Sequence, residues 1–334
     1  MKALVYTGPR QIEYRDEPDP VAAADEIVVK VEAVGICGSD MHAYFGHDER
    51  RPAPLILGHE TSGIALAGRY EGKRVVVNPL VSCNRCDDCL GGRANLCQTR
   101  QIISMPPRQG AFAEMVKVPE PNIIPIPDDL TPSHAALVEP IATALHGVCV
   151  AERALWRPLG ETSALVIGGG AVGLSAALVL TSRGARDVTI ADTNPGRRET
   201  AHNENLFTVV DSSVAGSVGD DAFGLVIDAV GGGATRKFAA RVIRPGGVIV
   251  HIGLMDSEEG INIRKLTLHE VTFIGTYTYT MVDFRAAIVA IHGGALGDLG
   301  WCDVRPLSEG PQAFSDLEAG RVDQAKIILH PDGG

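Results

Sequence analysis

The chain has 334 residues, enough for about two domains at roughly 150 residues each. It carries 41 Asp and Glu residues against 30 Lys and Arg residues. The resulting net charge of −11 argues against a nucleic-acid backbone or an anionic membrane surface as the main partner. A hydrophobic fraction of 45% and a charged fraction of 21% are ordinary for a globular protein and exclude disorder over most of the chain.

The first 140 residues are expected to form short strands separated by many turns. The N-terminal segment MKALVYTGPR is too short for a signal-peptide core and predicts a first strand. β-Branched runs bounded by Gly, Pro and Asp predict strands over 26–36 and 73–81. The proline-rich stretch 119–132 indicates extended chain near a domain boundary. No apolar run approaches the ~20 residues that span a bilayer, so we expect a cytoplasmic protein.

Near residue 160 the pattern changes to short apolar strands that alternate with helices. A strand over 164–170 precedes a helix over 171–184 that Gly184 ends. Further strands are predicted at 187–192, 208–210, 225–228, 248–253 and 271–275, with helices at 234–244 and 283–294. This alternation predicts an α/β fold with a doubly wound parallel sheet covered on both faces. A last strand over 324–330 has no place in that sheet, so we expect it to return to the first domain.

A glycine-rich turn joins the strand over 164–170 to the helix that follows it. Its G-x-G-x-x-G spacing permits a tight turn, lets the backbone approach a pyrophosphate and lets helix and strand pack closely. Asp192 ends the next strand, where a carboxylate hydrogen-bonds the adenosine ribose and repels the 2′-phosphate of NADP, so NAD is favoured. Arg197 and Arg198 leave an alternative open, because a guanidinium there could serve a 2′-phosphate or stack on adenine. The expected cofactor-binding residues are Gly168, Gly170, Val172, Gly173, Asp192 and Arg197.

Four of the seven cysteines lie within one short loop. Cys83, Cys86, Cys89 and Cys97 have the spacing C-x2-C-x2-C-x7-C, and without a secretory signal this clustering points to metal rather than disulfides. Four thiolates suit a tetrahedral structural Zn²⁺ with no open position. An iron–sulfur cluster is the competing interpretation, and the polar character of the loop favours zinc.

A second set of metal-ligand residues is dispersed along the first domain. Cys37 lies in GICGSDMH, and His59 and Glu60 lie in LGHET. Each alone is most often a core residue, but together they offer the thiolate, imidazole and carboxylate of an open catalytic zinc site. Adjacent residues of an extended chain point to opposite sides, so His59 and Glu60 can reach one ion only if the chain bends there.

The chain resembles the zinc-dependent medium-chain alcohol dehydrogenase/reductase family. The resemblance covers nearly the whole length and rests on GICGSDMH, GHE, the four-cysteine loop, LVEPIATALHG, GGGAVG and Asp192. It implies a GroES-like, mostly β catalytic domain made of residues 1–148 and 284–334, with a Rossmann NAD-binding domain inserted at 149–283. It also implies two Zn²⁺ per chain, one catalytic and one structural.

The sequence is most similar to the sorbitol (polyol) dehydrogenase branch of that family. By this resemblance Cys37, His59 and Glu139 ligate the catalytic zinc, and Glu60 lies in or next to the coordination shell, so which glutamate is the third protein ligand stays open. The resemblance also implies a relay that carries the substrate proton through Ser39 and the nicotinamide ribose to His42. The alternative for Ser39 is an ordinary helix N-cap.

Some residues depart from the branch and leave the substrate undecided. Ala43 follows the relay histidine where an aromatic residue is usual, and Thr278-Tyr279 replaces an Arg-Tyr pair. We therefore expect hydride transfer from a polyol or secondary alcohol to NAD. The alternatives are an amino-alcohol or simple alcohol dehydrogenase with the same zinc or, less favoured, a non-catalytic nucleotide-binding relative. The apolar segment 271–280 is an edge-strand candidate and predicts a homodimer or homotetramer.

Overall fold

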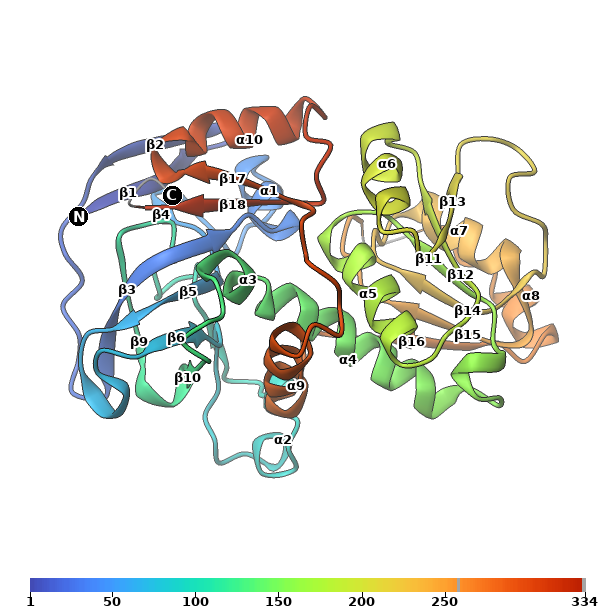
Figure 1. The fold of residues 1–334 in the computed structure, drawn as a ribbon, viewed down its shortest axis with the longest axis horizontal. Helices are drawn as coiled ribbons and strands as arrows, with labels where there is room; N and C mark the ends of the chain where they lie inside the picture. Colours follow the sequence, from blue (N-terminus) through green and yellow to red (C-terminus); the bar gives the residue numbers. More distant parts are fainter. Residues whose placement is uncertain (257–258, 332–334) are drawn as a thin grey trace.

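Both ends of the chain meet in one β-rich lobe, blue and red in Figure 1, beside a second lobe that contains the middle of the chain. The computed structural model describes residues 1–256 and 259–331. Within them, no helix is both long and apolar enough to cross a membrane.

The β-rich lobe is built on a seven-stranded sheet and a smaller three-stranded one. The path of the large sheet is β10 (Ile123–Pro125), β6 (Arg74–Val77), β5 (Glu60–Ala65), β3 (Glu26–Gly35), β18 (Lys326–His330) and β17 (Cys302–Pro306), with β9 (Met115–Pro119) also paired to β3. The small sheet is β2 (Gln11–Asp16), β1 (Lys2–Gly8) and β4 (Leu55–Ile56). β18 pairs antiparallel with β3, so the expected return of the last strand to the N-terminal region is confirmed.

Short helices and turns complete this lobe. A two-stranded ribbon of β7 (Leu80–Val81) and β8 (Gln101–Ile102) supports the cysteine loop, which contains α2 (Asp87–Leu90). The remaining helices of the lobe are α1 (Gly38–Tyr44), α3 (Pro132–Ala136) and α10 (Gly310–Glu318). Single 3-10 turns of this lobe lie at Gly68–Tyr70, Ala94–Leu96, Glu120–Asn122 and Leu307–Glu309, and another, Leu159–Glu161, directly precedes the first strand of the second lobe.

The second lobe is a parallel sheet of six strands with helices on its faces, as predicted. Its order is β13 (Thr208–Asp211), β12 (Val188–Asp192), β11 (Ala164–Ile167), β14 (Phe223–Asp228), β15 (Ile243–His251) and β16 (Thr272–Gly275). The helices of this lobe are α5 (Ala171–Ser182), α6 (Pro195–Asn203), α7 (Gly233–Val242) and α8 (Ile263–Leu268). Strand order reverses at β11, which places the ligand crevice at the carboxyl ends of β11 and β14.

Two long helices connect the lobes. α4 (Val138–Ala154) runs from the β-rich lobe to the parallel sheet (Figure 1) and packs against α5 and α9 (Met281–His292). One continuous apolar core includes residues of α4, α5, α9 and the parallel sheet. The first turn of α4 is therefore held rigidly at the junction of the lobes.

Several strands differ from the sequence expectation. The strand predicted over 73–81 is split into β6 and β7, which belong to different sheets. β15 begins at Ile243 instead of residue 248, because the chain passes directly from α7 into extended backbone across the Pro-Gly-Gly segment, with a register shift against β14. β17 was not predicted, since CDVRP is charged and ends in proline, a composition that suits an edge strand.

Candidate metal and cofactor sites

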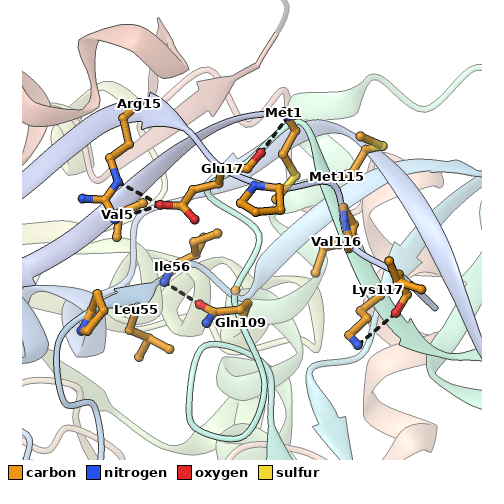
Figure 2. Close-up of a pocket in the computed structure, with 15 residues that line it drawn as sticks. Met1, Val5, Arg15, Glu17, Leu55, Ile56, Gln109, Met115, Val116 and Lys117 are labelled. Atoms are coloured by element: carbon orange, nitrogen blue, oxygen red, sulfur yellow. Dashed lines mark hydrogen bonds and ion pairs between the residues drawn. The ribbon is translucent and has the colours of Figure 1, made fainter. Parts of the chain in front are cut away.

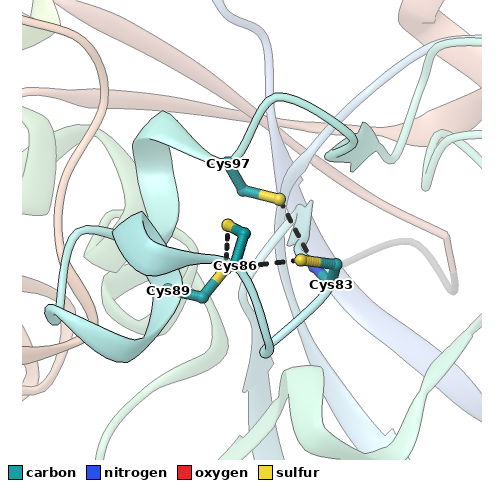
Figure 3. Close-up of side chains that lie close together, drawn as sticks. All are labelled: Cys83, Cys86, Cys89 and Cys97. Atoms are coloured by element: carbon teal, nitrogen blue, oxygen red, sulfur yellow. Dashed lines mark hydrogen bonds between the residues drawn. The ribbon is translucent and has the colours of Figure 1, made fainter.

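The four cysteines of the loop converge on one point (Figure 3). Sγ of Cys89 lies 3.5 Å from Sγ of Cys86 and 3.9 Å from Sγ of Cys83, and the Cys83 N–H points to Sγ of Cys97 at 3.5 Å. A tetrahedron with Zn–S bonds of about 2.3 Å has S···S edges of about 3.8 Å. The cysteine cluster therefore has the dimensions of a four-thiolate zinc site.

The backbone around this cluster favours thiolate at one of its members. Hydrogen bonds from the backbone at Arg85 and Cys86 lower the pKa of Cys83 to about 6. Desolvation, together with the neighbouring Cys86, raises the pKa of Cys89 to about 11, because the sulfurs cannot all carry charge without a cation between them. This is the electrostatic situation that a bound metal ion relieves.

Cys37, His59 and Glu60 form the second cluster, with ligand atoms that all lie within 4.8 Å of one another. The bend that the sequence argument required is present: Gly58 has φ +89° and precedes the start of β5 at Glu60, so His59 and Glu60 face the same point. Gly35 of β3 leaves the room for the carboxylate, since a Cβ there would clash with Oε2 of Glu60.

Asp40 holds both the cysteine and the histidine of this cluster in position. It is fully buried, its Oδ2 accepts the Cys37 N–H at 3.0 Å, and its Oδ1 lies 3.5 Å from Nδ1 of His59. Burial opposes charge on the His59 ring, but the Asp40 carboxylate outweighs it and raises the pKa of His59. With Nδ1 turned to Asp40, Nε2 is the nitrogen that faces a metal.

Lys326 of β18 holds Glu60, and sequence reasoning missed it. Its Nζ donates to both Glu60 carboxylate oxygens at 2.7 Å and to the Ile36 carbonyl at 2.9 Å, and both side chains are buried. The lysine inside the apolar run AKIIL is the sequence signal that could have identified it. Glu60 thus lies between a potential metal and an ammonium group.

Glu139 is a neighbour of the second cluster. Among the described residues, the ligand atoms that lie within 4.8 Å of one another belong to Cys37, His59 and Glu60, and the Glu139 carboxylate is not one of them. It lies in the first turn of α4, is buried, and interacts with the phenol of Tyr279. Burial raises its pKa to about 7, and the neighbouring Glu60 adds to that shift while His59 opposes it. The geometry therefore favours Glu60 as the third ligand, with Glu139 as a neighbouring carboxyl group.

The proposed relay residues Ser39 and His42 lie one turn apart on α1, on the same face. The N-cap of α1 is Cys37, so the alternative that Ser39 is the N-cap is wrong. The Ser39 carbonyl accepts a hydrogen bond from Nη1 of the buried Arg51 at 2.9 Å. Burial lowers the pKa of His42, and so does the charge of His47 and Arg51.

The glycine-rich turn has the shape expected of a dinucleotide cradle. Gly168 follows β11 with φ +99°, and a Cβ on Gly173 would clash with the Gly168 carbonyl oxygen, so both positions require glycine. α5 begins at Ala171 with no side-chain cap, and Val172 lies in its first turn, which leaves backbone N–H groups for a phosphate. The cradle therefore fits a pyrophosphate.

Asp192 and Arg197 lie beside this cradle. One carboxylate oxygen of Asp192 accepts the Gly169 N–H at 2.6 Å and the other accepts the Asn194 N–H at 2.7 Å. Arg197 extends over Gly169 and Gly170, and its buried Nε has no hydrogen-bond partner within the described residues. Both side chains thus border the glycine-rich cradle.

A separate pocket of about 340 Å³ lies on the β-rich lobe, between β1, β4 and β9 (Figure 2). Its wall contains Val5, Leu55 and Val116, with the Arg15–Glu17 ion pair at its rim. None of the residues that sequence analysis singled out lines it.

Comparison with known proteins places the chain among dehydrogenases. A model of the alcohol dehydrogenase GroES-like domain matches residues 23–128, and a model of the zinc-binding dehydrogenase domain matches residues 171–292. The L-galactonate-5-dehydrogenase of Escherichia coli (strain K12) is 33% identical over 85% of this chain and 85% of its own. The sorbitol dehydrogenase of Bacillus subtilis (strain 168) is 33% identical over 84% of this chain and 82% of its own.

Solved structures agree over the whole length. An alcohol dehydrogenase from Escherichia coli CFT073, complexed with NADH, superposes with a TM-score of 0.88 at 26% identity and covers 99% of both chains. NADP is bound in another similar structure. The resemblance and the fold class inferred from sequence are thereby confirmed, and the protein is an oxidoreductase. The chain belongs to the zinc-dependent medium-chain alcohol and polyol dehydrogenase family.

Proposed function

We propose that this dehydrogenase oxidises a polyol or secondary alcohol with NAD and uses two zinc ions per chain. The observation that carries the proposal is the convergence of Cys37, His59 and Glu60 within 4.8 Å, separate from a complete four-cysteine site. A mixed S, N and O ligand set leaves a position for substrate, whereas four thiolates close the coordination shell.

The chain's own residues support alcohol oxidation. Cys37, His59 and Glu60 would hold the catalytic zinc, which would supply Lewis acidity toward the alcohol oxygen. Ser39 accepts the hydroxyl proton and His42, one turn further along α1, delivers it to solvent. Burial, followed by the charges of His47 and Arg51, lowers the pKa of His42 and so favours the neutral imidazole, the form that can receive a proton.

The cofactor preference follows from Asp192. Two backbone N–H groups hold its carboxylate at the ribose position, so it cannot turn away from a 2′-phosphate. We expect NAD to be preferred, and Asp192→Ala to shrink that preference mainly by improving NADP. Asp187→Ala, at the exposed position just before the same strand, is the matched control. Native protein that uses NADP as well as NAD would overturn this assignment and favour Arg197.

We further propose the domain division 1–148 and 284–334 against 149–283, which the pairing of β18 with β3 supports. We also propose that the protein is cytoplasmic and that it forms a homodimer or homotetramer.

Metal analysis and a chelation series test the central assignment. We expect two zinc ions per chain and NADH production from polyols, read as absorbance. Mild chelation should abolish turnover before circular dichroism shows unfolding, because the mixed site exchanges more readily than the four-thiolate site. Loss of activity and loss of fold at the same chelator concentration would contradict two distinct roles.

A further inference from the structure

A second pocket, of about 560 Å³, lies at the edge of the parallel sheet opposite the glycine-rich cradle. We call it the amino-end pocket, because Thr162 precedes β11 and because Gly224 and Arg244 are the second residues of β14 and β15. The chain that follows α4 adds Trp156 and Arg157 to its wall. These strands run parallel and the cradle follows β11, so the pocket and the cradle lie at opposite ends of the strands.

Two guanidinium groups line the amino-end pocket. Within the described residues, neither Arg157 nor Arg244 forms a hydrogen bond or an ion pair through its side chain. Glu270 is the single carboxylate among the lining residues. The pocket therefore carries one positive charge in excess, although the net charge of the chain is −11, and its arginine donors are available to a ligand.

The position of Arg244 depends on a glycine. A Cβ on Gly224 would lie 2.5 Å from Nη2 and 2.8 Å from Cζ of Arg244, so the guanidinium group lies against the bare backbone of β14. Arg244 is also only partly exposed. A side chain that is already confined loses less conformational freedom when it binds a ligand.

Trp156 gives the amino-end pocket an aromatic surface. It is 85% exposed, whereas the other tryptophan, Trp301, is 3% exposed. An indole face stacks on flat rings, and guanidinium forks match the oxygens of a carboxylate or a phosphate. The volume of the pocket falls within the roughly 300–1,000 Å³ of small-molecule sites.

We propose that the amino-end pocket binds a small molecule with a flat aromatic or heteroaromatic ring and an anionic group, phosphate or carboxylate. Trp156 stacks on the ring, and Arg157 and Arg244 bind the anionic group. The pocket contains none of the metal-ligand or cradle residues, so the inference is independent of the proposed alcohol oxidation.

Tryptophan fluorescence tests this site in the zinc-loaded enzyme. AMP and benzoate are titrated beside their neutral analogues, adenosine and benzamide. We expect at least one anion to quench the emission and to bind about tenfold or more tightly than its neutral analogue, and the better anion identifies phosphate or carboxylate as the group bound. Equal affinities of anions and neutral analogues would overturn the proposal.

Two controls assign the signal to Trp156. The quenching should vanish in Trp156→Phe, which retains only the buried Trp301. Quenching that persists in this variant would place the ligand elsewhere and overturn the site. Acrylamide should quench Trp156 freely in the absence of ligand. A Trp156 shielded from acrylamide would also overturn the proposal, because a second copy of the chain would then cover the pocket.

Variants test the role of the arginines. Arg157→Gln and Arg244→Gln should each weaken binding of the anion about tenfold and leave the neutral analogue unchanged, because each removes one charge-assisted contact. Arg244→Lys should restore only part of the affinity, since an ammonium group keeps the charge without the fork. Arg264→Gln, at an exposed position of α8, is the control and should bind like the native protein. Unchanged affinity in both pocket variants, with native melting temperatures, would contradict the assignment.

Discussion

Lys326 and Glu60 place a charged pair in the interior at the metal cluster, and each stabilises the other only while both are present. Removing one partner of a buried pair leaves an uncompensated charge, which costs about 3–5 kcal/mol. We expect Lys326→Met to lower the free energy of unfolding of the zinc-free protein by about this amount. The measurement is urea denaturation with zinc removed.

A double-variant cycle separates this pair from general packing. Glu60→Gln combined with Lys326→Met should cost clearly less than the sum of the two single changes, because neither then strands a charge. Additive costs would show that the two side chains stabilise the fold independently. In Lys326→Met, zinc should recover part of the stability, since the metal replaces the ammonium group as the partner of Glu60.

The relay is tested at Ser39 and His42. Since Cys37 caps α1, Ser39→Ala should leave stability almost unchanged and lower kcat by roughly two or more powers of ten. His42→Gln should cost less, and most at low pH, where water and hydroxide are poor proton acceptors. NADH production across pH, with zinc content checked in each variant, is the measurement. A fully active Ser39→Ala would remove the relay from the mechanism.

At the scale of elements, α10 is tied to β17 by one carboxylate. Asp316 accepts hydrogen bonds from Arg305, Arg321 and Gln312, and these lower the pKa of Asp316, Arg305 first. A carboxyl group with a lowered folded-state pKa stabilises the fold above its unfolded pKa of about 3.9 and loses that contribution as pH falls.

Asp316→Asn should therefore flatten the acid side of the stability profile. The variant is expected to melt lower than the native protein at pH 7 and to approach it as pH falls below about 4. The measurement is the melting temperature of the native protein and of Asp316→Asn between pH 3 and pH 7. Asp129→Asn, at an exposed position paired with His292, serves as control. Parallel curves for native protein and Asp316→Asn would refute the coupling.

Sequence patterns predicted the elements whose chemistry is local. Alternating apolar strands, the glycine turn and the cysteine spacing identified the parallel sheet, the cradle and the four-thiolate cluster. Sequence analysis did not identify Lys326, because its partner Glu60 is 266 positions away in sequence and contacts it only through the pairing of β18 with β3.

At the scale of the whole molecule, the open edge of the parallel sheet predicts self-association. β16 is the last strand of the sheet, and within the described residues only β15 pairs with it. Its Thr272, Phe273 and Gly275 are exposed, so unpaired backbone groups and an aromatic side chain face outward. Such an edge is either blunted or covered in a stable protein.

We expect a dimer or tetramer with the parallel sheets at its centre. Light scattering at micromolar concentration should show a multiple of the 35.3 kDa chain mass. Phe273→Lys should shift the protein toward monomer, because a charge on an edge strand disfavours pairing, whereas Val304→Lys on the exposed edge strand β17 of the other sheet should not. Native protein found only as a ~35 kDa species would contradict association. A β17 variant that dissociates the assembly while Phe273→Lys does not would place the interface on the β-rich lobe.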